Sequence, residues 1–324
     1  MRRDASAAAV AFVILVSVAA AGAADLLPGD GTGGCAGISD DRERLECFDR
    51  LSARAAGEGE PPSRLSRLWE LDAESRRGKF AVTPYRSSYI LPYTWNASPN
   101  EGPVRAAEPD RTVQHEEVKF QISFKSKLWE DVLGRDIDLW AAYTQLSFWQ
   151  FYNFDDSAPF RETNYEPELL LNLRTDYCLL GFRGRYVNAG FNHQSNGRAE
   201  PLSRSWNRAV ANAGFERGDF VVVLSGWYRI PEAGSEDDNP GIERFVGYGQ
   251  VGVETAWRGH RFGLSLRNNL RGRGNKGSVQ VEWSFPLIRC VSGHVQYFNG
   301  YGESLLDYNA SGNRIGIGFV LKEW

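Results

Sequence analysis

From Val118 to the C-terminus, apolar residues alternate with polar ones in segments that are separated by turn residues. Alternation with a period of two predicts β-strands with one apolar and one polar face. The last segment is the clearest, because Ile315, Ile317, Phe319 and Leu321 share one face while glycine and lysine lie on the other. This half of the chain is therefore predicted to be a sheet with two different faces.

Eleven segments of this kind follow one another, each bounded by Asn, Gly, Asp or charged residues. They are Val118–Leu128, Ile137–Phe151, Tyr165–Tyr177, Leu179–Ser195, Ser205–Arg217, Phe220–Ile230, Phe245–Trp257, Arg261–Leu270, Gly277–Pro286, Val291–Gly300 and Asn313–Trp324. A closed antiparallel barrel with both ends on one side needs an even number of strands, and Ser88–Trp95 is the best addition despite Pro92. Many segments reach the roughly 9–11 residues with which a tilted strand crosses a bilayer. We predict an all-β fold, a twelve-stranded antiparallel transmembrane β-barrel with a short N-terminal extension.

The first residues have the pattern of a secretory signal. Two arginines follow Met1, Ala7–Val18 is apolar, and Ala21–Ala23 fits the small-residue cleavage pattern. The alternative is a membrane anchor helix, since Ala5–Ala24 carries no charge. The alanine- and serine-rich composition favours cleavage, so residues 1–23 are predicted to be a signal peptide.

Residues 24–110 differ from the rest in being rich in Gly, Pro, Glu and Arg, with one possible helix around Asp40–Arg54. Cys35 and Cys47 bracket a polar segment, and a local disulfide is expected in a chain that enters an oxidising compartment. We predict a periplasmic extension and linker over residues 24–80 and the barrel over residues 81–324.

Composition narrows the class of protein. The formal charge is −4, and without the leader's two arginines and one aspartate (+1) it is −5, which argues against a nucleic-acid partner. Ten Trp, 13 Tyr, 18 Phe and 34 Gly suit a barrel with aromatic girdles. Cys178 and Cys290 fall in strand-like segments and are expected to be small buried or lipid-facing apolar residues.

Chemistry is concentrated in the stretch Gly190–Arg208. His193 and Ser195 are two residues apart on a predicted strand, so they point to the same face. If the hairpin is symmetric about residue 200, Asn207 lies opposite His193, within roughly 5.5 Å between Cα or Cβ atoms. One hairpin thus brings together a nucleophile, a base and a group that orients the base.

The apolar residues on both strands share the face of this trio, and in a barrel with a polar interior that face meets lipid. A hydroxyl, an imidazole and a carboxamide are costly there unless they bond to one another. Their position suggests a lipid substrate. The alternative is that the trio merely borders the aromatic girdle and contacts lipid headgroups.

Five motifs closely resemble the outer membrane phospholipase A family of Gram-negative bacteria, over about residues 80–324. They are Asn192–Arg198 (NHQSNGR), Ser203–Arg208 (SRSWNR), Ser157–Pro167 (SAPFRETNYEP), Asp238–Pro240 (DNP) and Gly300–Asn309 (GYGESLLDYN). The resemblance implies a twelve-stranded barrel in the cell outer membrane, calcium dependence, and activation by homodimerisation.

The resemblance makes Ser195 the nucleophile, His193 the general base and Asn207 the residue that holds the imidazole. It implies hydrolysis of the fatty-acyl esters of glycerophospholipids and lysophospholipids at the sn-1 and sn-2 positions. A neutral amide in the third place fixes the imidazole tautomer but stabilises an imidazolium less than a carboxylate would.

The resemblance also implies Ca²⁺ ligands, namely the Arg198 carbonyl, the Glu200 carboxylate, the Ser203 hydroxyl and Ser157 of the partner subunit. Glu200 departs from the family, which has Asp there, so the longer side chain is expected to affect calcium affinity. Gln145 matches the polar residue that the family places at its dimer interface, and its alternative is an ordinary inward-facing residue.

Two other functions compete with the phospholipase. The first is a catalytically inert structural barrel or porin, which the charged residues at predicted interior positions disfavour. The second is an outer-membrane protease, which would need acidic residues beside the histidine, and no carboxylate pair accompanies His193.

Overall fold

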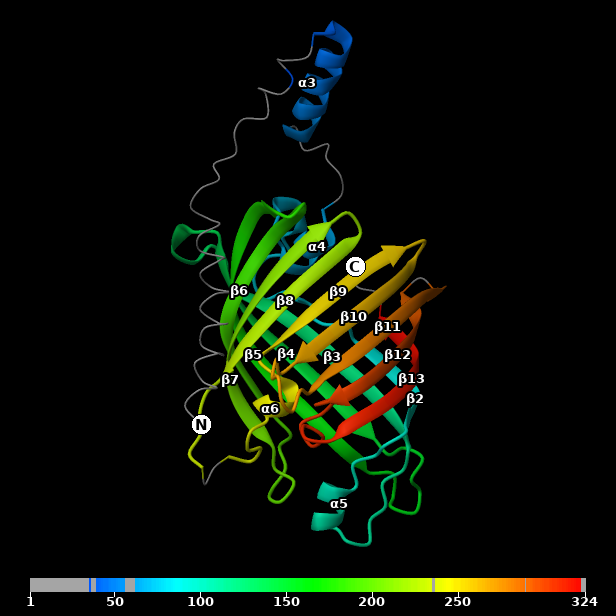
Figure 1. Cartoon of the computed structure of the whole chain (residues 1–324). Helices are drawn as coiled ribbons and strands as arrows, with labels where there is room; N and C mark the ends of the chain where they lie inside the picture. Colours follow the sequence, from blue (N-terminus) through cyan, green and yellow to red (C-terminus); the bar gives the residue numbers. More distant parts are fainter. Residues whose placement is uncertain (1–34, 36–38, 56–61, 235–236, 289, 322–324) are drawn as a thin grey trace.

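The computed structural model describes residues 35, 39–55, 62–234, 237–288 and 290–321. The predicted signal peptide, residues 1–23, and the aromatic C-terminal residue lie outside these ranges. Long strands wrap around a common axis over most of the described chain (Figure 1). No helix among the described residues is long and apolar enough to cross a membrane.

Twelve strands form the closed barrel. They are β2 (Tyr89–Asn96), β3 (Glu116–Trp129), β4 (Ile137–Trp149), β5 (Phe160–Leu179), β6 (Phe182–Ser195), β7 (Ser205–Arg217), β8 (Phe220–Arg229), β9 (Gly249–Trp257), β10 (His260–Asn268), β11 (Gly277–Ile288), β12 (Val291–Tyr301) and β13 (Ser311–Leu321). Each strand pairs antiparallel with the next, and β13 pairs with β2, which closes the sheet. The short β1 (Val82–Pro84) pairs with β3 beyond the end of β2. The predicted twelve-stranded barrel is confirmed.

The segment Phe245–Trp257, predicted as one strand, is divided. Glu243–Val246 forms the short helix α6, and β9 begins only at Gly249. Gly247 between them has a φ of +76°, and a Cβ there would meet the carbonyl oxygen of Asn268 at 2.3 Å. Only glycine fits this close approach, and the bend that it allows separates the helix from the strand.

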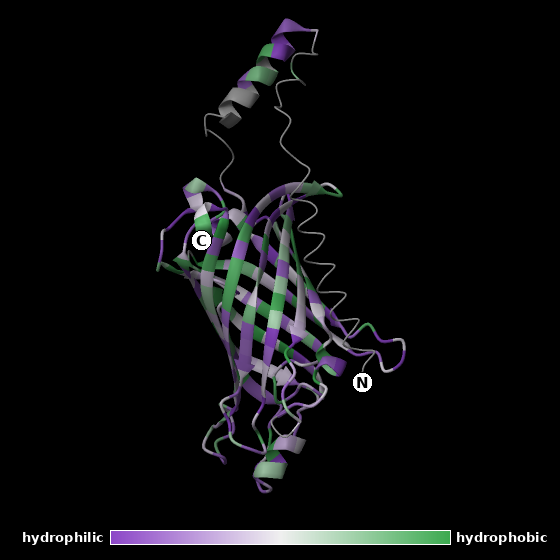
Figure 2. Ribbon diagram, turned by 90° about the vertical axis from the view of Figure 1, so that its left-hand side faces the viewer, coloured by the Kyte–Doolittle hydropathy of each residue, from purple (hydrophilic) through white to green (hydrophobic). Residues whose placement is uncertain are grey.

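The two faces of the sheet differ as the alternation predicts. Ile315, Ile317, Phe319 and Leu321 of β13 are all exposed on the outside, whereas Arg314 is buried inside. Figure 2 shows hydrophobic and hydrophilic residues alternating along the strands of the wall. An apolar exterior around a polar interior is the arrangement of a barrel that stands in lipid.

Paired charges fill part of the interior. Glu117 accepts from Arg161 at 2.6 Å and from Arg314 at 2.7 Å. Glu303 in turn lies 2.9 Å from Arg314 and 2.8 Å from Lys119. Each of these buried charges has an opposite partner, as a low-dielectric interior requires. These charges form an interior network that joins β3 to β5, to β13 and to the loop between β12 and β13.

Small helices lie at the ends of the barrel. They are α4 (Arg64–Trp69), η1 (Ala73–Ser75), α5 (Gly102–Ala107) and η2 (Val132–Gly134), besides α6. Figure 1 shows α4 at the end with the short turns and α5 at the end with the long loops. Short turns are characteristic of the periplasmic end of such barrels, and long loops of the outer end.

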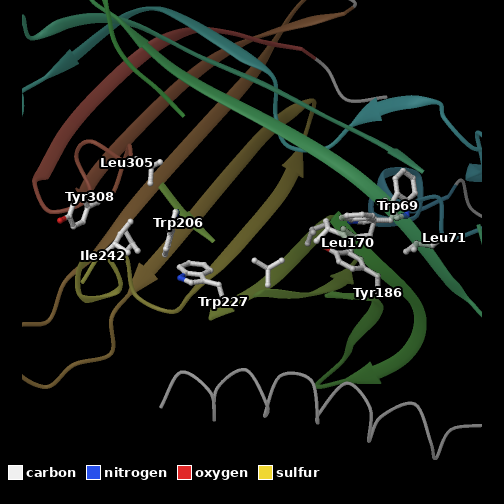
Figure 3. Packing of buried hydrophobic residues seen from close by; sticks show 14 residues of the cluster. Trp69, Leu71, Leu170, Tyr186, Trp206, Trp227, Ile242, Leu305 and Tyr308 are labelled. Atoms are coloured by element: carbon white, nitrogen blue, oxygen red, sulfur yellow. The ribbon is translucent and has the colours of Figure 1, made fainter. Parts of the chain in front are cut away.

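The helix α4 closes the short-turn end, although the sequence predicted only a linker there. Ser63 caps it by accepting from the Ser66 amide at 3.2 Å. Trp69 is 2% exposed and packs edge-on against Trp140, with ring centroids 5.7 Å apart, and against Tyr186 (Figure 3). Residues 64–69 therefore belong to the barrel core, above a polar cavity of about 430 Å³.

The predicted helix of the extension is α3 (Asp41–Ala55), and Asp40 caps it by accepting from two amides of the first turn. Cys35 and Cys47 form the predicted disulfide, with Cα atoms 5.7 Å apart. Cys178 and Cys290 are exposed free thiols close to the short turns. The buried alternative is therefore wrong for both cysteines, and the lipid-facing alternative stays a prediction.

Replacing Trp69 with alanine should loosen α4. Removing a buried indole costs about 3–5 kcal/mol, partly because the cavity that it leaves does not collapse. We expect faster tryptic cleavage after Arg67 in detergent, measured by mass spectrometry of timed digests. Trp257→Ala, which removes an indole that is 61% exposed, is the matched control. Equal cleavage rates in the two variants would show that the Trp69 packing does not hold α4.

Candidate active site

The β6–β7 hairpin carries the candidate site, and its register is the predicted one. His193 lies opposite Asn207, and Ser195 lies opposite Ser205. On the other side, Ser195 pairs with Tyr165 of β5. The trio of Ser195, His193 and Asn207 is therefore gathered at the end of two neighbouring strands.

Asn207 contacts the imidazole directly. Its Oδ1 lies 2.8 Å from Nδ1 of His193. A carboxamide oxygen only accepts hydrogen bonds, so the proton of this bond sits on Nδ1. The other ring nitrogen, Nε2, is then free of its proton and able to act as a base.

The trio faces the outside of the barrel. On the same face of β5 and β6, Leu169 and Phe191 are 46% and 45% exposed. Asn192 and Arg208, the sequence neighbours of His193 and Asn207, are instead buried in the interior. Because side chains alternate along a strand, His193 and its partners lie on the lipid-facing wall, at the long-loop end.

Interior charges hold the three strands of the site in register. Arg208 of β7 donates to Asn192 of β6 at 3.0 Å and lies 3.0 Å from Glu166 of β5. Asn192 also donates to Glu166 at 2.8 Å, and Arg86 pairs with the same carboxylate at 2.8 Å. Removing any member leaves a buried polar group without its partner, so this network stiffens the wall behind the site.

The loop 196–204 is organised by Asn196, whose part the sequence did not reveal. Its Oδ1 accepts from the amides of Arg198 and Arg204 at 3.3 and 3.0 Å, and its Nδ2 donates to the Leu202 carbonyl at 2.8 Å. The Arg198 guanidinium donates to two carbonyls at the start of β5. The loop is thus fixed at both its ends and its middle.

The predicted calcium ligands of this chain lie on two loops. Arg198, the exposed Glu200 and Ser203 share the loop 196–204, and the Ser203 hydroxyl donates to Asp238 at 2.5 Å. All the donors are oxygens, from a carbonyl, a carboxylate and a hydroxyl, which fits the preference of Ca²⁺. Within the described ranges no three His, Cys, Asp or Glu residues cluster as a metal site. Of the predicted ligands, only Glu200 is a residue of these four types.

Ser157, the fourth predicted ligand, lies on the loop between β4 and β5 with a φ of +60°. Its neighbour Asp156 accepts from the Asn153 amide at 2.9 Å and from Thr112 at 3.3 Å. Hydrogen bonds from these two residues hold the pKa of Asp156 below its usual range. The loop therefore carries a stable negative charge next to Ser157.

Gln145 lies on the outer face of β4, between exposed Ile122 of β3 and exposed Tyr165 of β5. Its amide accepts from the Tyr143 hydroxyl at 3.2 Å and donates to Ser147 at 3.2 Å. The inward-facing alternative for Gln145 is therefore excluded by the geometry. Hydrogen bonds thus join Tyr143, Gln145 and Ser147 along this strand, with Tyr143 and Gln145 partly exposed and Ser147 buried beneath its neighbours.

Comparison with known proteins gives a family. The family model described as phospholipase A1 matches residues 65–321. Phospholipase A1 of Klebsiella pneumoniae is 40% identical over 293 residues, which are 87% of this chain and 99% of that protein. A protein of Neisseria meningitidis described as a putative phospholipase A1 is 40% identical over 289 residues, 85% of this chain and 74% of that protein.

Two solved structures share the architecture. An active-site mutant of the outer membrane phospholipase A of Escherichia coli superposes with a TM-score of 0.74 at 34% identity, covering 81% of this chain and 99% of that one. The Salmonella typhi outer membrane phospholipase, a dimer with bound calcium, gives a TM-score of 0.74 at 36% identity with the same coverage. The resemblance drawn from the motifs is confirmed: this outer-membrane β-barrel belongs to the phospholipase A1 family.

Proposed function

We propose that this chain hydrolyses acyl esters of glycerophospholipids and lysophospholipids, at the sn-1 and sn-2 positions, with Ser195, His193 and Asn207 as its triad. The observation that carries the proposal is the 2.8 Å contact between His193 Nδ1 and Asn207 Oδ1 on the lipid-facing wall. Polar groups are costly in that position, which marks the trio as a functional site, and a membrane lipid is the ligand that such a site faces.

The chemistry follows from the tautomer. Asn207 keeps the proton on Nδ1 of His193, so Nε2 can take the proton of the Ser195 hydroxyl as that oxygen attacks the ester carbonyl. His193 then returns the proton to the departing lysophospholipid. Water, deprotonated by the same imidazole, cleaves the acyl-enzyme and restores Ser195.

The tetrahedral intermediate needs donors for its oxyanion, and the backbone N–H of Ser195 is the nearest candidate. Calcium held by the Arg198 carbonyl, Glu200, Ser203 and Ser157 of the partner subunit would supply further positive charge there when bound. The Salmonella typhi relative, a calcium-bound dimer, supports this assignment for the present chain.

A homodimer fits the outer face of β4. The partly exposed Gln145 amide has hydrogen-bonding capacity beyond its bonds to Tyr143 and Ser147, which lipid cannot satisfy and a second copy can. Because Ser157 comes from that copy in the proposed site, one chain alone has an incomplete ligand set. Assembly would then control hydrolysis, and a monomer would spare the membrane that holds it.

A passive porin explains less of the structure. Ion pairs such as those of Glu117 occupy part of the lumen, and α4 covers the short-turn end with buried Trp69. Neither feature suits an open channel. An outer-membrane protease would use carboxylates, and the group that His193 contacts is an amide.

Ser195→Ala should abolish lysophospholipid and fatty-acid release from mixed micelles with calcium. Loss of a serine nucleophile costs about 10⁶-fold in kcat when the triad acts as a unit. Ser225→Ala, a hydroxyl that lines the interior cavity, should keep the wild-type rate. Mass spectrometry after sulfonyl-fluoride treatment should map the label to Ser195. Wild-type turnover by Ser195→Ala would reject the triad, and a label at another serine would name the true nucleophile.

Glu200→Ala should raise the calcium concentration that gives half-maximal hydrolysis, because it removes the one charged ligand of the proposed set. Glu101→Ala, which removes a carboxylate from the loop that carries α5, is the control and should leave calcium dependence unchanged. The electrophoretic heat shift of both variants should equal that of the wild type. An unaltered calcium titration for Glu200→Ala would remove Glu200 from the ligand set.

A further inference from the structure

The amide of Asn207 has a second partner. Its Nδ2 donates to Oε1 of Glu232 at 3.2 Å, on the side away from His193. Its backbone carbonyl accepts from the Ile230 amide at 2.8 Å, so the chain just after β8 is held against this residue. The sequence offered no signal for Glu232, which lies in an irregular segment between β8 and β9.

We propose that Glu232 is a positioning residue for ester hydrolysis, with a carboxylate that holds the Asn207 amide in the orientation that serves His193. This inference rests on the proposed triad and extends it by a fourth member. Glu232 does not touch the reacting atoms, since it acts through Asn207.

A carboxamide group is nearly symmetric in shape. Its oxygen and nitrogen ends have nearly the same shape, so packing alone does not choose between two orientations related by a half-turn. An ionised carboxylate only accepts hydrogen bonds, and Glu232 therefore selects the orientation with Nδ2 toward itself. Oδ1 must then face His193. In the other orientation, Oδ1 of Asn207 would face the Glu232 carboxylate, so two acceptors would meet. Its Nδ2 would face the N–H of His193 Nδ1, so two donors would meet.

The same contact determines the protonation of the imidazole. With Oδ1 fixed toward His193, the ring nitrogen that faces it must be the one that carries the proton. Nε2 stays available for Ser195. Glu232 thus selects, through one amide, the tautomer that base catalysis needs.

Charge adds a second effect. During the reaction His193 becomes an imidazolium, and a neutral Asn stabilises that cation less than a carboxylate would. The Glu232 side chain is only 16% exposed, so its negative charge behind Asn207 is little screened by water. The Glu232 carboxylate behind Asn207 therefore adds the electrostatic stabilisation of the imidazolium that the neutral amide does not provide.

Arg229 is the cation nearest to this carboxylate, at 3.4 Å from Oε2. It also pairs with Asp237 at 2.5 Å and with Glu243 at 3.6 Å. One guanidinium is thus shared by three carboxylates, so it offsets only part of the negative charge of Glu232. Arg229 binds Oε2, which leaves Oε1 for the Asn207 amide.

A merely structural role for Glu232 would consist of its pairing with Arg229. Glu243 of α6 pairs with the same guanidinium, whereas the side chain of Asn207 bonds to His193 and Glu232. Glu243→Gln therefore removes a comparable ion pair and leaves the amide contact in place. It is the matched control.

The experiment measures kcat and KM for the full-length protein on mixed micelles of a glycerophospholipid with calcium. Glu232→Ala should lower kcat about tenfold, the value of one hydrogen bond to a charged group, with KM changed less than about twofold. Glu232→Gln keeps an acceptor without the charge and should lose about threefold. Glu243→Gln should keep the wild-type kcat. In an Asn207→Ala background, Glu232→Ala should cause no further loss, because its effect passes through the missing amide.

Ser195→Ala is assayed in the same series to separate the two proposals. Wild-type turnover by Ser195→Ala overturns the triad and the role of Glu232 together. An inactive Ser195→Ala with wild-type kcat in Glu232→Ala overturns the role of Glu232 alone, and so does an additive loss in the Asn207→Ala background. Because Glu232→Gln is nearly isosteric, its sulfonyl-fluoride labelling rate provides a second measurement if Glu232→Ala does not form a heat-modifiable barrel. Labelling of Glu232→Gln at the wild-type rate would then reject the proposal.

Discussion

The constraint on which the structure depends is that a lipid-exposed backbone has no water to pair with. Every N–H and C=O in the membrane must find a partner within the sheet, and only closure of the sheet satisfies the edge strands. The pairing of β13 with β2 meets this requirement. Once the sheet is closed, the pleat decides which residues meet lipid and which meet the lumen. The outward position of His193 is therefore a consequence of closure and of its place in the strand.

The two faces then support each other at the β6–β7 hairpin. Outside, His193 and Asn207 satisfy one another in a medium that offers few other partners. Inside, Arg208 joins Asn192 and Glu166 across three strands. Neighbouring residues of one strand thus belong to the external site and to the internal network. A rigid wall suits a site on an outer face, because the strands themselves then fix its geometry.

Much of this could be predicted from the sequence, because it depends on local spacing. The period of two gave the strands, and the symmetry of the hairpin placed Asn207 opposite His193. The helix α4 could not be predicted in this way, since its six residues are too few to show a helical period and its arginines resemble a linker. Trp69 becomes a core residue only when a barrel is present around it.

The remaining parts depend on contacts between distant segments. Glu232 meets Asn207 through an irregular loop, and Asp238 meets Ser203 across two loops, so neither contact has a spacing that sequence can show. The separation of α6 from β9 was missed for a related reason, because the close approach of Gly247 to Asn268 involves another strand. The proposed roles of Ser157 and Gln145 depend on a second copy of the chain. Contacts between two copies cannot be predicted from residue spacing within one of them.

The helix α4 has a consequence for the fate of the reaction products. Because this helix covers the short-turn end and ion pairs occupy part of the lumen, the interior is not an open channel through which a detergent-like product could leave. On the proposed mechanism, both the fatty acid and the lysolipid therefore diffuse sideways into the leaflet beside the long loops. The products would therefore accumulate first in the lipid that surrounds the barrel, and the bilayer next to the protein would be the first part to change in composition.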